Sequence, residues 1–398
     1  MKIQTLKGFR DYLPLEAKKR QYLINMLKTV FETYGFEPLE TPVLEYEEIL
    51  TGKYGEESEK LIYKFEDLGK RKVAMRYDQT IPLARVIAQY QNVLPFPFKR
   101  YQIQPVWRAE NTQKGRLREF LQCDIDTVGT NTPESDAEIL IIIADVLKKF
   151  KIADYKILIN DRITFADLPT KAIIIIDKLK KIGKERVMRE LSENGFDPEI
   201  LNKINNSKTT PNLKQIIESS EKMGLDEGKI FFDPTLARGL DYYTGTIIEV
   251  EIPGYSAGSV GGGGRYDNLI GIFSKKQIPA VGFSFGFDRI IEALEELNLF
   301  PNSFSITQIL VTIFSQKLKD KSIELSSLLR SNNINAELYL DENAKMEKQL
   351  KYADNKGIPF VAIIGPEEVA KNVIVLKNMK TREQKALTLD EVVKILNT

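Results

Sequence analysis

The chain has 398 residues, of which 42% are hydrophobic and 28% charged, and its net charge is +1. This length allows two or three domains, and the composition is that of a soluble globular protein. The single cysteine, Cys123, excludes an internal disulfide and a cysteine-held zinc cluster. The sequence contains no histidine, which excludes serine–histidine and cysteine–histidine catalysis and imidazole-bound metals. Acid–base chemistry therefore falls to carboxylates, tyrosine, lysine, water or the substrate itself.

The apolar segments do not predict a membrane protein. The longest run, Ile139 to Val146, is interrupted by Asp145 and is too short to span a bilayer. The N-terminal sequence MKIQTLKGFRDYLP lacks the apolar core of a signal peptide, so we expect a cytoplasmic protein without membrane contact. Basic and acidic residues nearly balance, at 57 and 56, so any nucleic-acid contact must rest on local patches.

The first predicted element is a helix from Leu15 to Tyr34, which Gly35 ends. After it, Pro38 and Pro42 exclude a helix and favour an extended segment. This unit serves either ordinary packing or a contact between subunits, and the sequence leaves both open.

Two short strands then flank the turn LGKRK at 68–72, and a helix is predicted from Ile81 to Gln91 with Thr80 as its N-cap. Asp78 lies just before this helix, where the helix dipole favours a carboxylate. A structural cap is the simpler interpretation of Asp78, and binding of a cationic ligand group is the alternative.

Residues 100–129 are predicted to form a hairpin with a basic, glycine-containing loop. In its first strand, Arg108 and Glu110 are two positions apart and share a face. In its second strand Phe120, Gln122, Asp124 and Asp126 share one face, and Leu121, Cys123 and Ile125 share the other. Such polar groups are costly to bury unless they are paired or face a polar ligand, so this face is either solvated or a binding site.

The middle of the chain begins with a helix predicted at Pro133–Phe150 and a strand at Tyr155–Asn160. Residues 169–229 then show short helical patterns separated by glycine, asparagine and proline. We interpret them as an inserted helical module without a candidate catalytic cluster.

Strand character returns at 244–252, and the run Gly261–Gly264 follows. Such a run is most often a turn or bulge, although it also lets the backbone approach a ligand closely. Residues 280–294 predict a strand, then Gly286, then a helix with Arg289 in its first turn. An arginine beside free helix N–H groups makes an anion site, and a surface arginine is the alternative.

After a linker at 301–305, strand and helix patterns alternate, which predicts a separate α/β domain with a mainly parallel sheet. One of its helices carries a basic stripe made by Lys345, Lys348, Lys351 and Lys356. From the stripe alone, a solvated helix face is favoured over phosphate contact.

Seven motifs together resemble one known family. They are GFRDYLP at 8–14, TP at 41–42, RYDQT at 76–80, VWRAE with GRLREFLQCDIDTVG at 106–129, ARGLDYYTGTIIE at 237–249, GGGGRYDNL at 261–269 and VGFSFGFDRI at 281–290. Their order is that of the histidyl-tRNA synthetases, which are class II aminoacyl-tRNA synthetases, and the resemblance covers nearly the whole chain. ARGLDYY is the most specific motif, because it resembles the histidine-binding signature of the family.

The resemblance implies an α+β class II catalytic domain, an antiparallel sheet with flanking helices, at 1–168 and 230–300. It further implies an inserted helical domain at 169–229, a C-terminal α/β anticodon-binding domain at 306–398, and a homodimer. The implied substrates are L-histidine, ATP with Mg²⁺ and tRNA-His, and no structural metal is expected. Histidine would first react with ATP to give histidyl-adenylate, and the histidyl group would then pass to the 3′ end of the tRNA. Neither step requires a protein nucleophile, since positioning and charge stabilisation suffice.

The resemblance also implies roles for residues that would bind ATP. Arg108 would bind the α-phosphate, and Glu110 would lie near the adenine amino group. Phe120 would stack on one side of the adenine ring, and Arg289 would cover the other side and reach the γ-phosphate. Arg116 would contact the triphosphate. Stacking beside a bidentate-capable arginine suits a flat base with a charged tail. Lys114 and Arg118 are the residues implied for the acceptor end of the tRNA.

A second set would bind histidine. Asp78, Thr80, Gln122 and Asp126 resemble residues that hold its ammonium and imidazole groups, and Tyr242, Tyr243 and Tyr266 resemble those around the imidazole. Arg238 resembles an arginine that contacts the carboxylate and the α-phosphate, so that Arg238 and Arg108 are the implied catalytic residues. Asp126 stands where some members have glutamate, and Asp124 has no implied role.

Two inactive relatives are the alternatives: the regulatory subunit of ATP phosphoribosyltransferase, and a synthetase-like sensor of uncharged tRNA. The regulatory subunit would be expected to lack the C-terminal domain and to have lost ATP-binding arginines. This chain has a C-terminal domain and keeps Arg108, Arg238 and Arg289. These arginines argue against both alternatives.

Overall fold

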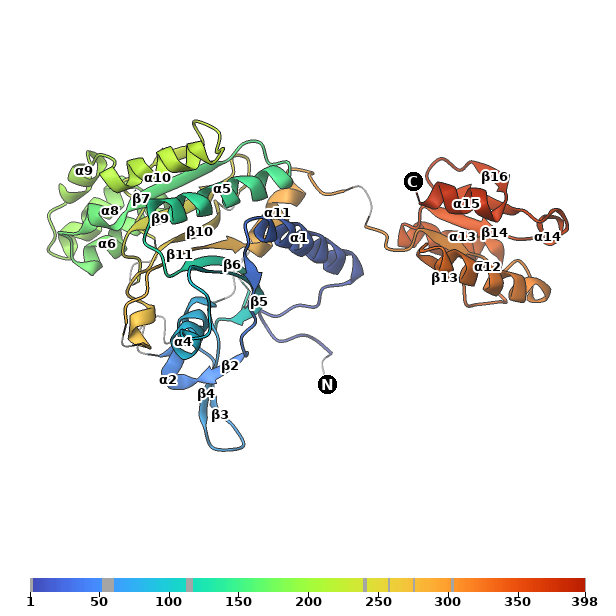
Figure 1. Cartoon of the computed structure of the whole chain (residues 1–398), viewed down its shortest axis with the longest axis horizontal. Helices are drawn as coiled ribbons and strands as arrows, with labels where there is room; N and C mark the ends of the chain where they lie inside the picture. The colour runs from blue at the N-terminus through green and yellow to red at the C-terminus, as the bar shows by residue number, and fades with distance from the viewer. Residues whose placement is uncertain are drawn as a thin grey trace. The chain divides into compact units, whose positions relative to one another are not determined.

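The computed structural model describes residues 3–51, 61–111, 117–238, 242–256, 258–274, 276–301 and 304–397. The chain forms two compact units, Met1–Phe300 and Pro301–Thr398 (Figure 1). Within the described ranges, no helix is long and apolar enough to cross a membrane.

A central eight-stranded sheet organises the first unit (Figure 1). In spatial order its strands are β1 (Glu37–Pro38), β5 (Phe98–Trp107), β6 (Glu119–Val128), β11 (Ala280–Gly286), β10 (Ser259–Arg265), β9 (Thr246–Glu251), β7 (Lys156–Asp161) and β8 (Ile230–Phe232). All neighbours are antiparallel except the edge pairs β1–β5 and β7–β8, which are parallel. The predicted antiparallel sheet is therefore confirmed for the inner strands.

One face of this sheet is covered by helices and carries the main core (Figure 1). The covering helices are α1 (Pro14–Thr33), α5 (Pro133–Lys149), α10 (Pro211–Lys222) and α11 (Phe287–Glu296). Cys123 and Ile125 of β6 are fully buried on this side. The helices predicted at 15–34 and 133–150 are thus confirmed to within about a residue at each end, and Gly35 ends the first at a positive φ of 76°.

A smaller three-stranded sheet, in the order β2 (Leu44–Tyr46), β4 (Lys72–Met75) and β3 (Lys64–Glu66), lies beside the helices α2 (Glu47–Leu50) and α4 (Thr80–Tyr90). The predicted N-cap at Thr80 is wrong by one position, because Gln79 occupies the cap and Thr80 opens the helix. The side chain that reaches a free helix N–H is Asp78, whose Oδ1 accepts a hydrogen bond from Ile81 N at 3.2 Å. This bond confirms the interpretation of Asp78 as a structural cap of the helix.

Residues 162–205 add the 3₁₀ helix η1 (Arg162–Phe165) and the helices α6 (Thr170–Asp177), α7 (Leu179–Ile182), α8 (Lys184–Glu193) and α9 (Ile200–Asn205). Their core includes Leu158 of β7 and Ile247 of β9, two strand residues that point to the face opposite α1 and α5. These helices therefore cover the outer strands of the second sheet face, whereas α10 belongs to the main core on the first.

The second unit has a five-stranded sheet in the order β13-β12-β14-β15-β16. Its elements are β12 (Ile309–Val311), η3 (Gln316–Leu318), α12 (Lys319–Ser331), β13 (Ala336–Leu338), α13 (Met346–Lys356), β14 (Phe360–Ile363), α14 (Pro366–Lys371), β15 (Ile374–Asn378), β16 (Gln384–Leu387) and α15 (Leu389–Leu396). The prediction of a mainly parallel sheet is wrong for half of the pairings, because β15 is antiparallel to both β14 and β16. The β15–β16 connection is a short turn, and a parallel crossover needs about a dozen residues.

The basic stripe of this unit is exposed and partly paired. Lys348 Nζ lies 3.0 Å from Asp341 and Lys356 Nζ lies 2.5 Å from Glu337. These ion pairs fit the interpretation of a solvated helix face.

Candidate active site

The face of the sheet opposite α1 and α5 carries two rows of residues in register. One row is Gln102, Asp124, Ser284, Gly262 and Glu249, and the next is Arg100, Asp126, Gly282, Gly264 and Ile247, on β5, β6, β11, β10 and β9 respectively. Residues that oppose one another in adjacent strands point to the same face. The predicted alternation along residues 120–126 is therefore confirmed, and the polar row is largely buried rather than solvated.

The glycines of these rows make room for side chains of the site. A Cβ atom at Gly282 would lie 1.9 Å from Asp126 Oδ1, and one at Gly262 would lie 1.6 Å from Arg238 Nη1. Gly264 similarly admits the ring of Tyr243. The expected turn at Gly261–Gly264 is wrong, because these residues lie within strand β10, whereas the alternative of a bulge is supported by a register shift between Ser259 and Gly261. The close approaches are to the protein's own atoms, both side-chain and backbone.

Arg100 and Asp126 form a buried ion pair at the centre of the face. Arg100 Nη2 lies 2.7 Å from Asp126 Oδ2, in a contact that is not aligned as a hydrogen bond. Arg100 Nη1 donates to Gln102 Oε1 at 3.3 Å, and Tyr266 donates a short hydrogen bond to Asp126 Oδ1. Burial raises the pKa of Asp126, while Arg100 and Tyr266 oppose the shift. Arg100 was not among the predicted site residues.

Asp124 is the second buried carboxylate of the same strand. The residue is 4% exposed; its carboxylate is hydrogen-bonded to Ser284, but Oδ1 has no hydrogen-bond partner among the residues that the structure describes. Burial raises the pKa of Asp124 to about 7; Arg100 opposes this shift, and Asp126 adds to it. Strand alternation correctly predicted that Asp124 shares a face with Gln122 and Asp126, but the sequence indicated no role for it.

Three tyrosines adjoin these carboxylates. The ring centroids of Tyr242 and Tyr243 are 4.4 Å apart, and those of Tyr242 and Tyr266 are 5.9 Å apart. Tyr242 donates to the Tyr243 hydroxyl at 3.1 Å. Burial raises the pKa of all three hydroxyls, and Asp78 is near enough to contribute to the shift at Tyr242. Asp78, Asp124, Asp126 and the three tyrosines are called the tyrosine–aspartate cluster below.

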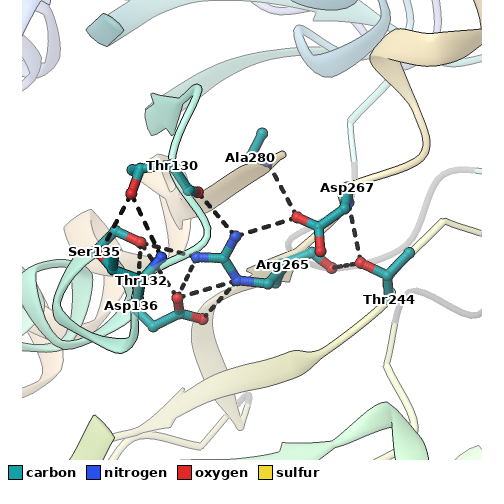
Figure 2. A network of polar contacts seen from close by, with 8 residues as sticks. All are labelled: Thr130, Thr132, Ser135, Asp136, Thr244, Arg265, Asp267 and Ala280. Atoms are coloured by element: carbon teal, nitrogen blue, oxygen red, sulfur yellow. Dashed lines mark hydrogen bonds and ion pairs between the residues drawn. The ribbon is translucent and has the colours of Figure 1, made fainter. Parts of the chain in front are cut away.

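A separate network fixes the strand end that carries Tyr266 (Figure 2). The Arg265 guanidinium donates to Asp136, to Ser135 Oγ at 2.8 Å, to Thr130 O at 3.1 Å and to Asp267 Oδ1 at 3.1 Å. The backbone oxygen of Arg265 accepts from Thr244 N at 2.7 Å. The network thus ties β10 to the first turn of α5 and holds the segments on which Tyr243 and Tyr266 stand.

Arg238 extends over Gly262 at the edge of the cluster. Its Nε lies 2.5 Å from Glu249 Oε2, and its side chain is 36% exposed. The helical insert brings further charges here, because Lys180 lies 3.8 Å from Glu249 and the pKa of Asp177, raised mainly by burial, is lowered in part by Arg238. Asp177 and Lys180 were missed, since helical periodicity alone does not indicate which sheet edge a helix end will meet.

Residues expected to bind ATP gather at the other end of β5 and β6. Arg108 and Glu110 lie just beyond β5, with Arg108 Nη1 4.0 Å from Glu110 Oε1. The Arg108 Cζ atom lies 5.1 Å from the centre of the Phe120 ring, and its Nε donates to Tyr77 O at 2.9 Å. The phosphate-binding and base-stacking residues of the prediction are thus neighbours.

Arg289 and Gln122 lie near this end. Arg289 occupies the first turn of α11, as predicted, and its Nη1 donates to Ser259 O at 2.6 Å. Gln122 faces Gly286, which immediately precedes α11, and Gln122 Nε2 lies 3.5 Å from Ser284 Oγ. Arg118 Nε donates to Glu110 O at 3.1 Å. Lys114 and Arg116 lie outside the described residues.

A cavity of about 440 Å³ opens on the helix-covered side, between the end of α5 and the segment before β8. Its walls include Lys148, Lys151 and Lys229 together with Asp145 and Asp226. No residue of the two polar rows lines it. We therefore locate the candidate active site at the polar rows, where buried carboxylates, tyrosines and arginines converge.

Comparison with known proteins gives a consistent answer. A family model for histidyl-tRNA synthetase matches residues 8–173 and 165–290, and one for an anticodon-binding domain matches 308–398. The histidine–tRNA ligase of Cytophaga hutchinsonii is 41% identical over 97% of this chain and 98% of its own length. That of Christiangramia forsetii is 42% identical over 96% of each. The crystal structure of histidyl-tRNA synthetase from Nostoc sp. PCC 7120 superposes with a TM-score of 0.88 at 31% identity, covering 100% of this chain and 99% of the other. The chain belongs to the histidyl-tRNA synthetase family.

Proposed function

We propose that this chain is a histidine–tRNA ligase, which activates L-histidine with ATP and transfers the histidyl group to the 3′ end of tRNA-His. One observation carries the proposal. The tyrosine–aspartate cluster, suited to an amino acid with two nitrogen-bearing groups, adjoins Arg238, and the Arg108–Phe120 pair lies farther along the same sheet face. An amino-acid site and a nucleotide site are thus supported side by side.

The cluster suits the cationic and aromatic parts of histidine. We assign the ammonium group to Asp78, Thr80 and Gln122, because ionised carboxylates and amide oxygens are strong acceptors for N⁺–H donors. Tyr242, Tyr243 and Tyr266 would enclose the imidazole. The carboxylate would meet Arg238, which is partly exposed although it pairs with Glu249.

The nucleotide would lie along the outer ends of β5 and β6. We assign ATP to Arg108, Glu110, Arg116, Phe120 and Arg289. The Arg108–Phe120 contact supports this assignment, since a ring beside a guanidinium can receive a base and a phosphate together. Mg²⁺ would accompany ATP as part of the substrate, bound mainly by phosphate oxygens.

Catalysis would consist of positioning and charge stabilisation. A carboxylate oxygen of histidine attacks the α-phosphorus, and the bond to the bridging oxygen breaks to release pyrophosphate. A terminal ribose hydroxyl of the tRNA then attacks the carbonyl carbon, its proton passes to a phosphate oxygen of the adenylate, and AMP leaves with the electron pair of the anhydride bond. Arg238 and Arg108 would stabilise the negative charge on the oxygens of the α-phosphate in the first step.

The remaining assignments concern tRNA and assembly. We propose that residues 306–398 bind the anticodon, which the match to an anticodon-binding model at 308–398 supports. Residues 1–168 and 230–300 would hold the catalytic site, with 169–229 inserted between them, and Lys114 and Arg118 would meet the acceptor end. We further propose a cytoplasmic homodimer, and measurement of the mass in solution by light scattering tests it: a monomer at micromolar concentration would contradict it.

The direct test of the function is ATP–pyrophosphate exchange by the purified full chain with Mg²⁺ and each amino acid in turn. Histidine alone should support exchange, and tRNA-His should then become charged. Absence of histidine-dependent exchange would refute the ligase proposal. Exchange without charging of tRNA-His would instead identify an enzyme that only activates the amino acid.

A further inference from the structure

Lys180 of the helical insert lies among three carboxylates at the outer strands of the central sheet. It belongs to α7, and its Nζ lies 2.8 Å from Glu251, 3.4 Å from Asp233 and 3.8 Å from Glu249. Glu249 and Glu251 are two positions apart on β9 and share a face, and Asp233 directly follows β8. Burial lowers the pKa of Lys180, but the three carboxylates together raise it above its usual value. The ammonium group is therefore the shared counter-ion of these carboxylates.

Two of the three carboxylates lead to Arg238. Glu249 Oε2 accepts from Arg238 Nε at 2.5 Å, whereas Lys180 approaches the other oxygen, Oε1. Asp233 acts on the backbone that precedes Arg238. Its Oδ1 accepts from Thr235 N at 3.0 Å and from Thr235 Oγ1 at 2.7 Å, while Oδ2 faces Lys180. Lys180 is thus one residue removed from both the guanidinium of Arg238 and the turn that leads to it.

The guanidinium of Arg238 is held at one nitrogen. Glu249 occupies Nε, and within the described ranges no acceptor binds the terminal nitrogens Nη1 and Nη2. Gly262 lets the guanidinium lie against β10, because a Cβ there would be 1.6 Å from Nη1. Glu249 faces Gly262 across the two strands, so the residue that holds Nε and the residue that admits Nη1 are neighbours. The terminal nitrogens can therefore bind an anionic ligand, in a direction that depends on Glu249.

The contacts of Lys180 should matter more for geometry than for stability. The Lys180 side chain is 48% exposed, and ion pairs of such exposed groups contribute little to the free energy of folding. A catalytic group is far more sensitive to its position, since a displacement of about 1 Å can lower a rate about a hundredfold. Loss of Lys180 should therefore change the reaction rate and leave the fold intact.

We propose that Lys180 is a positioning residue for adenylate formation, which binds Glu249 and Asp233 and thereby fixes the guanidinium of Arg238. This role rests on the proposed function, in which Arg238 stabilises the charge on the α-phosphate. It also gives the helical insert a part in the first step of the reaction, because α7 must lie on the outer strands for Arg238 to be held in place. Without α7 there, Glu249 loses its second partner and Arg238 loses its fixed direction.

The test compares Lys180→Gln with Lys178→Gln in histidine-dependent pyrophosphate exchange by the full chain. Lys178 is the matched control, because it lies two residues away and its Nζ is 2.9 Å from Glu190 of the same insert. Lys180→Gln should lower kcat about tenfold to a hundredfold and change the KM for ATP less than about twofold. Lys178→Gln should keep the wild-type kcat. A wild-type kcat in Lys180→Gln, or an equal loss in Lys178→Gln, would overturn the proposal.

A double-mutant cycle separates positioning from a merely structural role. In the Arg238→Ala background, Lys180→Gln should lower the rate of adenylate formation no further, because the group through which Lys180 acts is gone. Single-turnover kinetics measure this rate, and the same fold-loss in both backgrounds would overturn the proposal. Glu249→Gln should also lower kcat, and its loss should not multiply with that of Lys180→Gln. Full multiplication in the double variant would show that the two residues act separately and would likewise overturn the proposal.

Two outcomes distinguish this inference from the function on which it rests. A wild type without histidine-dependent exchange refutes the proposed function itself. An active wild type with an unaffected Lys180→Gln refutes only the positioning role. The melting temperature of Lys180→Gln, which should stay near that of the wild type, checks that a lost rate does not come from unfolding.

Discussion

Two buried arginine–aspartate pairs lie in the same unit and differ in completeness. Around Arg265 all three guanidinium nitrogens donate hydrogen bonds, and both oxygens of Asp136 accept (Figure 2). Around Arg100, Nε has no acceptor and Asp124 Oδ1 has no donor within the described ranges. A buried polar group costs least when its hydrogen bonds are complete. We infer that the complete network fixes the fold, and that the incomplete one is completed by the substrate.

The largest expected effect concerns the candidate active site and not the network around Arg265. Arg238→Ala should lower the rate of adenylate formation by about a hundredfold to a thousandfold, since it removes a charge that stabilises the transition state. ATP binding should weaken far less. Single-turnover kinetics with histidine and ATP measure the two separately, and equal losses in both would contradict a transition-state role.

A substitution that breaks the complete network around Arg265 should lower the stability of the protein and leave substrate binding unchanged. Asp136→Asn removes the buried counter-ion of Arg265 and leaves only the partly exposed Asp267 at 3.1 Å, which costs about 3–5 kcal/mol of unfolding free energy. Chemical denaturation measures this loss, and the KM for histidine of the folded variant should stay at the wild-type value. A normal stability together with a raised KM would reverse the roles that we assign to the two networks.

Neighbouring glycines of β10 offer a matched pair of variants. A Cβ at Gly262 meets the flexible end of Arg238, whereas one at Gly263 lies 2.1 Å from the backbone oxygen of Gly282. Gly262→Ala should therefore keep the melting temperature near that of the wild type and lower kcat about tenfold or more by displacing Arg238. Gly263→Ala should lose about 1–3 kcal/mol of stability through overpacking. Thermal melts and pyrophosphate exchange together check both, and an active Gly262→Ala would show that Arg238 need not lie over this glycine.

The smallest expected effect is a pH dependence of stability. The pKa of Asp124 is raised from 3.8 to about 7 by burial, so between these values the native state holds a proton that the unfolded state has lost. Its contribution to stability is fully present below the unfolded pKa and is lost as the pH rises through about 7. The difference in unfolding free energy between the wild type and Asp124→Asn should thus fall from pH 4 to pH 7. A flat difference across this range would show that the carboxyl group ionises normally.

Much of the site could be predicted from strand alternation, which put Asp124 and Asp126 on one face and Cys123 in the core. Arg100 was missed because its partner is set by the register of β5 against β6, and a lone arginine in a strand is indistinguishable from a solvated one. The glycine run was interpreted as a turn or bulge. The register does shift between Ser259 and Gly261, but the continuous strand and its close contacts with Arg238 and Phe283 could not be predicted, because these residues are distant in sequence.

Two further differences have the same origin. At the start of α4 the favoured interpretation of Asp78 as a structural cap is confirmed, whereas the N-cap predicted at Thr80 is wrong, because Thr80 is already the first residue of the helix. In the second unit, alternating helix and strand patterns indicate that strands exist but do not give the direction of β15. Local pattern fixes which residues share a face, whereas partners across the sheet depend on topology.

The most direct test of the central claim is the KM for histidine in pyrophosphate exchange, measured side by side for the wild type, Asp136→Asn and Asp124→Asn. We predict one value shared by the wild type and Asp136→Asn, and a value about tenfold to a hundredfold higher for Asp124→Asn. The same KM in all three proteins would contradict the claim that the incomplete network is where the substrate binds.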